Sequence, residues 1–92
     1  MPTVEMTSHL YRFFPALENR ALNVPSGSVA QVLQAIDAIA PGFRDYVLDD
    51  HGALRRHVKI CVNETMVIDR KGLSDLVQQQ DRVFIFQALS GG

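Results

Sequence analysis

The sequence predicts a single α+β domain in which a mixed sheet of about five strands packs on one main helix. Three observations support this prediction. The chain has 92 residues, 47% of them hydrophobic and 21% charged, as is typical of one small globular domain. Residues 29–39 have the apolar spacing of an amphipathic helix. The remaining apolar segments are short and resemble strands.

The first two strands are expected to form a hairpin. Residues 4–14 are rich in β-branched and aromatic side chains and begin with an alternation of apolar and polar residues. Residues 15–19 are predicted to turn, and residues 20–24 to return as the second strand. Pro25-Ser26-Gly27 ends that strand.

The main helix is the clearest local prediction. Ser28 and Gln31 have the spacing of a capping box, in which each residue satisfies a backbone N–H of the other. Pro41-Gly42 ends the helix. Its predicted apolar face consists of Val29, Val32, Leu33, Ile36 and Ile39.

The second half of the chain contains a helical turn and three further strands. Residues 43–47 are predicted to form one helical turn and residues 49–52 an exposed loop. Residues 57–63 alternate cleanly, so that Val58, Ile60 and Val62 should point to one face. The remaining predictions are a turn at 63–64, a short strand at 66–68, a brief helical turn at 72–76 and a last strand at 83–89.

This order of elements predicts a β-grasp, or ubiquitin-like, fold. The first and last strands can lie side by side in the middle of the sheet, and the helix must cover one face. The domain should span residues 1–89. Residues 90–92 should form a flexible tail, because Ser90, Gly91 and Gly92 follow the last apolar residue.

The C-terminal third resembles a known family. The stretch VNETMVIDRKGLSDLVQQQDRVFIFQALSGG is similar to the ubiquitin-like sulfur carriers, which include the small subunit of molybdopterin synthase and the thiamine sulfur carrier. The matching marks are residues 62–65, Leu73, Leu76, Asp81 and the final Gly91-Gly92. LRRHVKICVN and SGSVAQVLQAI are more similar to carriers that serve cysteine biosynthesis. Gln80 stands where many relatives have glycine, which affects only the type of turn.

The resemblance implies that the chain is a carrier rather than an enzyme. In this family an E1-like partner enzyme uses ATP and magnesium to adenylate the terminal carboxylate, here that of Gly92. Sulfur then replaces adenosine monophosphate and leaves a thiocarboxylate, which a downstream acceptor enzyme uses. The chain itself is expected to hold no metal or cofactor. Glycine suits such a tail because it has no Cβ to obstruct a narrow channel.

The last strand also predicts a docking surface. Phe84 and Phe86 share one face of the strand, and Val83 and Ile85 share the other with Gln87. If the helix covers Val83 and Ile85, Phe86 is exposed.

We expect a partner-binding patch of Met66, Phe86 and Leu89, since an exposed apolar patch on a small protein usually marks a binding surface. The resemblance implies docking on the adenylating enzyme. The alternative is that Phe84 and Phe86 pack under residues 43–54.

Composition argues against several other classes of protein. The net charge is −1 and no basic stripe is present, so a nucleic-acid partner is not expected. No apolar run approaches the roughly 20 residues of a membrane span, and the N-terminus does not resemble a signal peptide. A single cysteine, Cys61, fits a reducing cytoplasm and is interpreted as an apolar filler rather than a resolving thiol. The histidines are too scattered for a metal site.

Three functions therefore stay open at the level of sequence. The first is a sulfur carrier for cysteine, molybdenum cofactor, thiamine or a related product. The second is a ubiquitin-like modifier joined through Gly92 to lysines of target proteins. The third is an interaction module whose Gly91-Gly92 is only a frayed or truncated end.

Overall fold

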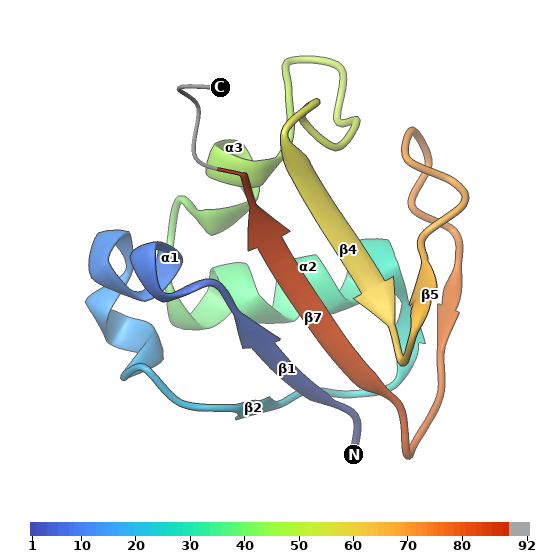
Figure 1. The fold of residues 1–92 in the computed structure, drawn as a ribbon, viewed down its shortest axis with the longest axis horizontal. Helices are drawn as coiled ribbons and strands as arrows, with labels where there is room; N and C mark the ends of the chain where they lie inside the picture. The colour runs from blue at the N-terminus through green and yellow to red at the C-terminus, as the bar shows by residue number, and fades with distance from the viewer. Residues whose placement is uncertain (89–92) are drawn as a thin grey trace.

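The computed structural model describes residues 1–88, which form a five-stranded mixed sheet with a helix across one face (Figure 1). The strands lie in the order β2-β1-β7-β4-β5. Their bounds are β1 Thr3–Met6, β2 Leu22–Asn23, β4 Val58–Val62, β5 Thr65–Met66 and β7 Arg82–Gln87. The first and last strands, β1 and β7, pair in parallel, and the other neighbours are antiparallel. The β-grasp prediction is confirmed.

Helix α2 (Val29–Ile39) covers the inner face of the sheet and begins with the predicted capping box. The Ser28 hydroxyl accepts a hydrogen bond from the Gln31 amide at 3.2 Å, and Gln31 Oε1 accepts one from the Ser28 amide at 2.9 Å. The prediction that Ile39 is buried is wrong, because its side chain is 43% exposed. Ala40 is buried in its place, since it lies four residues beyond Ile36 and so on the same face of the helix.

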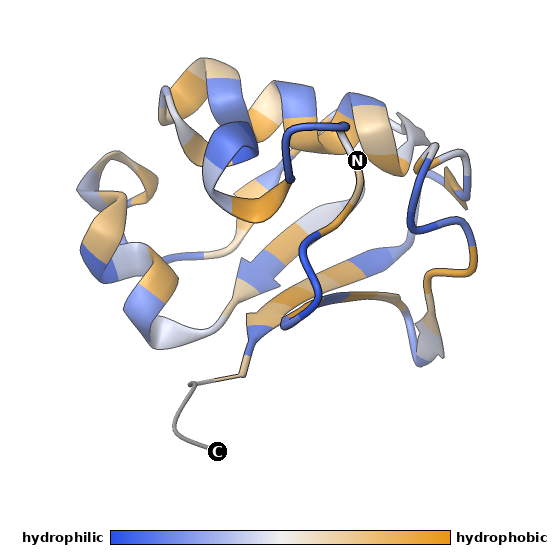
Figure 2. Ribbon diagram, turned by 90° about the horizontal axis from the view of Figure 1, so that it is seen from above, coloured by the Kyte–Doolittle hydropathy of each residue, from blue (hydrophilic) through white to orange (hydrophobic). Residues whose placement is uncertain are grey.

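The hydrophobic core lies between α2 and the sheet. The inward residues of the three central strands are almost completely buried and form one cluster with the apolar face of the helix. They are Val4 and Met6 of β1, Val58 and Ile60 of β4, and Val83 and Ile85 of β7. Figure 2 shows the helices on one side of the sheet and none on the other side.

Residues 4–14 do not form one continuous strand, contrary to the sequence prediction. Strand β1 ends at Met6, and helix α1 (Ser8–Phe13) follows, then the short 3-10 helix η1 (Pro15–Leu17). Leu10 and Leu17 are fully buried. The aromatic content of this segment favours a strand only where a neighbouring strand is available, and here tertiary packing of α1 against the core decides the structure.

The predicted helical turn at 72–76 is also absent from the structure. Leu73 has a left-handed backbone with φ 55°, and β6 (Leu76–Val77) pairs antiparallel with β3 (Gly27–Ser28) as a separate two-stranded sheet. The predicted turn at 43–47 is confirmed as helix α3 (Phe43–Val47). Residues 43 and 47 are buried in the same core cluster as the sheet.

Candidate docking surface

The central strand β7 divides its side chains between the core and the open face of the sheet. Val83 and Ile85 point inward and are 2% and 0% exposed. Phe84 and Phe86 therefore lie on the outer face, where their rings are 5.6 Å apart with an interplanar angle of 45°. Phe84 is 41% exposed and Phe86 is half-buried.

Sheet register extends this aromatic pair into a larger apolar surface. Phe84 lies opposite Cys61 of β4, and Cys61 lies opposite Met66 of β5. The Cys61 thiol lies 3.0 Å from the Met66 sulfur. We use the term outer-face patch for the surface formed by Phe84, Phe86, Cys61 and Met66. Glu5 lies beside Phe84, and Lys59 lies beside Phe86, so charged side chains border the patch.

The structure brings together Met66 and Phe86, two of the three residues predicted for the patch, and adds Phe84. The sequence places both phenylalanines on one face but does not show which is more exposed. The segment 43–54 does not shield Phe84, and its buried residues Phe43, Val47, Leu48 and Leu54 pack in the core with Ile85. Leu89, Ser90, Gly91 and Gly92, the other predicted site residues, lie outside the described residues, as does the predicted flexible tail.

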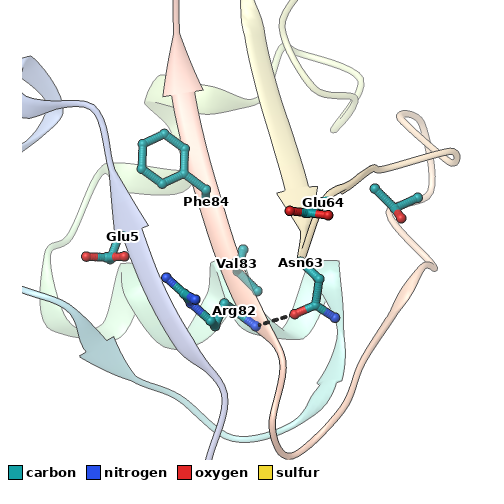
Figure 3. Close-up of a pocket in the computed structure, with 7 residues that line it drawn as sticks. Glu5, Asn63, Glu64, Arg82, Val83 and Phe84 are labelled. Carbon is teal, nitrogen blue, oxygen red and sulfur yellow. Dashed lines mark hydrogen bonds between the residues drawn. The ribbon is translucent and has the colours of Figure 1, made fainter.

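An open hollow of about 620 Å³ adjoins the patch at the start of β7 (Figure 3). It is lined by Glu5, Asn63, Glu64, Thr65, Arg82, Val83 and Phe84. The Asn63 side chain shapes one wall: Oδ1 accepts a hydrogen bond from the Arg82 amide and Nδ2 donates one to Asp81, both at 3.0 Å. Hydrogen bonds from the Gln78 amide and from Asn63 lower the pKa of Asp81. The hollow therefore borders the apolar patch with polar side chains, one of which, Asn63, is held by two hydrogen bonds.

The groups that could support catalysis do not converge in the structure. Among residues 1–88, no three His, Cys, Asp or Glu side chains are grouped to hold a metal ion. His9 contacts Gln87, His51 lies in the exposed loop after α3, and His57 lies just before β4. Cys61 is half-buried on the outer face beside Met66, instead of filling the core.

No helix within residues 1–88 has both the length and the hydrophobicity needed to cross a membrane.

A comparison with models of known protein families identifies the family of the chain. The model of the ThiS family matches residues 14–92, which include every strand of the sheet except β1. The chain belongs to the ThiS family. No curated protein matches the sequence significantly.

Solved structures similar to this ThiS-family chain share its fold over nearly the whole length. A chain of the Amycolatopsis orientalis BexX/CysO complex is 19% identical, with a TM-score of 0.84 and 100% of both chains covered. Mycobacterium tuberculosis CysO, described as an antigen, is 24% identical with a TM-score of 0.82, covering 97% of this chain and 100% of that one. Haloferax volcanii SAMP1 is 20% identical with a TM-score of 0.75, covering 99% of this chain and 98% of that one.

Membership of the ThiS family confirms the resemblance seen in the sequence. The chain has the fold shared by ThiS-like sulfur carriers and ubiquitin-like modifiers, small proteins that are carriers rather than enzymes. The outer-face patch is an exposed apolar surface, a feature that on a small protein usually marks a binding site.

Proposed function

We propose that this protein carries sulfur as a thiocarboxylate on Gly92. The family match supports this proposal most strongly, because it continues through β7 to the Gly91-Gly92 sequence. In the proposed cycle an E1-like partner enzyme, using ATP and magnesium, joins the Gly92 carboxylate to adenosine monophosphate and releases pyrophosphate. A sulfide equivalent then attacks the acyl carbon, the bond to the phosphate oxygen breaks, and the thiocarboxylate and adenosine monophosphate are formed.

The residue types at the end of the chain suit this chemistry. A carboxylate is a poor acyl electrophile, and adenylation supplies a good leaving group. The end of the chain must enter the partner's active site, and Gly91 and Gly92 offer the smallest cross-section and the widest backbone freedom. Ser90 is proposed to begin this segment. The sulfur stays covalently attached until an acceptor enzyme takes it, so it is not lost by diffusion.

We assign docking on the adenylating enzyme to the outer-face patch, extended by Leu89. Phe84 and Met66 are each 41% exposed although they are apolar, and Phe86 supports the Phe84 ring. Aromatic side chains in the centre of an interface often contribute most of its binding energy. The bordering Glu5 and Lys59 would set orientation rather than affinity.

The acceptor is proposed to be a biosynthetic enzyme. The resemblance of residues 26–36 and 54–63 to carriers of cysteine biosynthesis favours cysteine as the product, with molybdenum cofactor and thiamine as the alternatives. A second function is favoured by the fold shared with Haloferax volcanii small archaeal modifier protein 1, namely conjugation of Gly92 to lysines. A ladder of covalent conjugates in host extract, detected with an antibody to this chain, would support the modifier function.

The proposal is tested by intact-mass analysis of the protein purified from its own host. Replacement of one oxygen by one sulfur, mapped to the C-terminal peptide, is the expected result. In parallel, fractions of host extract are assayed for ATP–pyrophosphate exchange that depends on the added chain. The matched control is the same chain without Gly92. Exchange that proceeds equally well with this control would contradict the proposal.

A further inference from the structure

The last residue of β7, Gln87, is held by two side chains that follow β1. The backbone pairing of β1 with β7 ends at Met6 and Ile85. Beyond it, the Thr7 amide donates to the Ile85 carbonyl at 3.0 Å, and the Thr7 hydroxyl accepts a hydrogen bond from the Gln87 amide at 3.1 Å. The His9 ring, through Nε2, lies 3.2 Å from Gln87 Oε1, within hydrogen-bond distance.

These contacts replace strand pairing at the point where β1 has turned away. The chain enters α1 at Ser8, so no further backbone of β1 is available to the amide of Gln87. Thr7 precedes this helix but makes no side-chain capping bond, which leaves its hydroxyl to Gln87. The ring of Phe13 lies edge-on to His9, with centroids 6.4 Å apart, and restricts the imidazole.

On its other side, which faces β4, the end of β7 is also held by a hydrogen bond. The Ala88 amide donates to the His57 carbonyl at 3.0 Å, next to β4. Hydrogen bonds from both sides therefore hold the strand through residues 87 and 88. The ladder with β4 continues to Gln87, which lies opposite Val58, whereas on the β1 side the Thr7 and His9 contacts stand in for strand pairing.

We propose that Thr7 and His9 are positioning residues that fix the direction in which the chain leaves the sheet toward Gly92. This inference rests on the proposed function, since it concerns how the Gly92 carboxylate is placed for adenylation. Gln87 and Ala88 set the point and the direction from which the remaining residues start relative to the outer-face patch, and a misplacement of about 1 Å at a reacting centre can reduce a rate about 100-fold. Both residues precede residue 14 and so lie outside the part of the chain that matches the family.

The test compares Thr7→Val with Thr7→Ser and with a matched control. Valine keeps the branched shape but removes the hydroxyl, and serine restores the hydroxyl. Ser28→Ala is the control, because it also removes a hydroxyl that accepts a backbone amide, at 3.2 Å, but at the start of α2. His9→Ala is a second variant, used if Thr7→Val fails to fold; it removes the contact with the Gln87 side chain, together with the edge-on contact with Phe13, and leaves the Thr7 hydroxyl in place.

Two measurements are made on each variant. Amide hydrogen exchange at Gln87 and Ala88 reports local opening of the strand end. ATP–pyrophosphate exchange, with the host fraction that activates the wild-type chain, gives kcat and the KM for the carrier. Thr7→Val should accelerate amide exchange at Gln87 and lower kcat about tenfold, with KM almost unchanged because the outer-face patch is intact. Thr7→Ser should restore both properties, and Ser28→Ala should alter neither.

The outcomes separate this inference from the function on which it rests. If Thr7→Val opens the strand end but retains the wild-type kcat, the contacts are only structural and the proposal is overturned. A loss of kcat in Ser28→Ala equal to that in Thr7→Val would overturn it too, because general stability would then set the rate. If the wild-type chain supports no exchange with any host fraction, the proposed function fails, and the positioning role fails with it.

Discussion

At the scale of single residues, two aspartates organise the loop between β5 and β6. The Asp75 carboxylate accepts hydrogen bonds from the amides of Ile68 and Asp69, at 2.9 and 2.8 Å. The Asp69 carboxylate accepts from the Gly72 amide at 2.8 Å and from the Ser74 hydroxyl at 2.6 Å. Side-chain oxygens thus satisfy backbone groups that have no strand partner.

These bonds favour the ionised forms of both aspartates. Hydrogen bonds from Ser74 and from the Gly72 amide lower the pKa of Asp69 from 3.8 to about 2. The amides of Ile68 and Asp69 lower the pKa of Asp75 in the same way. Ionisation of these residues is therefore coupled to the folded loop.

We predict that Asp69→Asn destabilises the protein at neutral pH, and that the difference from wild type shrinks in acid. A carboxyl whose pKa is depressed in the folded state contributes stability above its unfolded pKa, and loses it as pH falls through the folded pKa. The window for Asp69 lies between pH 3.8 and about 2. Urea unfolding of both proteins across this range measures the effect.

Asp50→Asn, on the exposed turn before β4, is the control for removal of one negative charge. A difference between Asp69→Asn and wild type that stays constant from neutral pH to pH 2 would show that the Asp69 hydrogen bonds do not depend on its charge.

At the scale of elements, β7 has two faces with different roles. The inner face carries Val83 and Ile85 into the core, and the outer face carries Phe84 and Phe86. Adjacent residues of one strand should therefore respond oppositely to the same substitution. This contrast separates a contribution to folding from a contribution to binding.

We predict that Phe84→Asp and Phe86→Asp weaken binding to the adenylating enzyme while the domain stays folded. Loss of an aromatic anchor from an interface costs about 2 kcal/mol or more. Ile85→Asp should unfold the domain, because it places an unpaired charge in a completely buried position. Circular dichroism and a binding assay on each variant provide the measurements.

Leu76→Asp is the matched control for the binding defect. Leu76 is a 69% exposed apolar residue on β6, in the other sheet, so its change to aspartate should spare both fold and binding. If Phe84→Asp unfolds the protein while Ile85→Asp does not, the assignment of the two faces is inverted.

The elements differ in how well the sequence predicts them. Helix α2 and strand β4 are predicted correctly because their apolar residues recur with the period of the element over several residues, and Ser28 and Gln31 mark the helix start. Strand β7 is recognised from its apolar run. The β3–β6 pair was not predicted, since each strand has two residues and their pairing joins positions 27–28 to 76–77. Helix α1 was missed because its aromatic residues have strand propensity.

The candidate site is predicted less completely than the fold. Alternation places Phe84 and Phe86 on one face, but Cys61 joins the patch only through the register of β4 with β5 and β7. Thr7 and His9 contact Gln87 from about 80 positions away in the sequence, which no local pattern reveals.

At the scale of the whole molecule, one central strand, β7, carries the proposed docking residues and leads to the proposed reacting residue. β7 lies in the middle of the sheet, hydrogen-bonded to β1 and β4, so its position is among the most constrained in the domain. The strand that presents Phe84 and Phe86 also leads toward Gly92, six residues beyond Phe86. A fully extended chain spans at most about 3.5 Å per residue, so Gly92 can reach no farther than about 20 Å from Phe86.

This limit sets the geometry required of a partner. An enzyme that docks on the outer-face patch must have its adenylating centre within about 20 Å of the site that receives Phe86. Extra residues after Gly92 would move the carboxylate away from that centre or force the chain to bend inside the channel. Length, as well as residue type, should therefore control activation.

We predict that adding a single alanine after Gly92 nearly abolishes activation. The extended chain keeps the fold, the outer-face patch and a terminal carboxylate, but it adds one residue of length and a Cβ at the reacting position. A displacement of about 1 Å can already lower a rate about 100-fold, and one extra residue adds up to about 3.5 Å. Gly92→Ala keeps the length and adds only the Cβ, so it should be impaired less. ATP–pyrophosphate exchange, with intact-mass analysis to detect trimming, compares the three proteins. Activation of the untrimmed extended chain at the wild-type rate would mean that Gly92 is not the reacting residue, and the proposed carrier chemistry would fail.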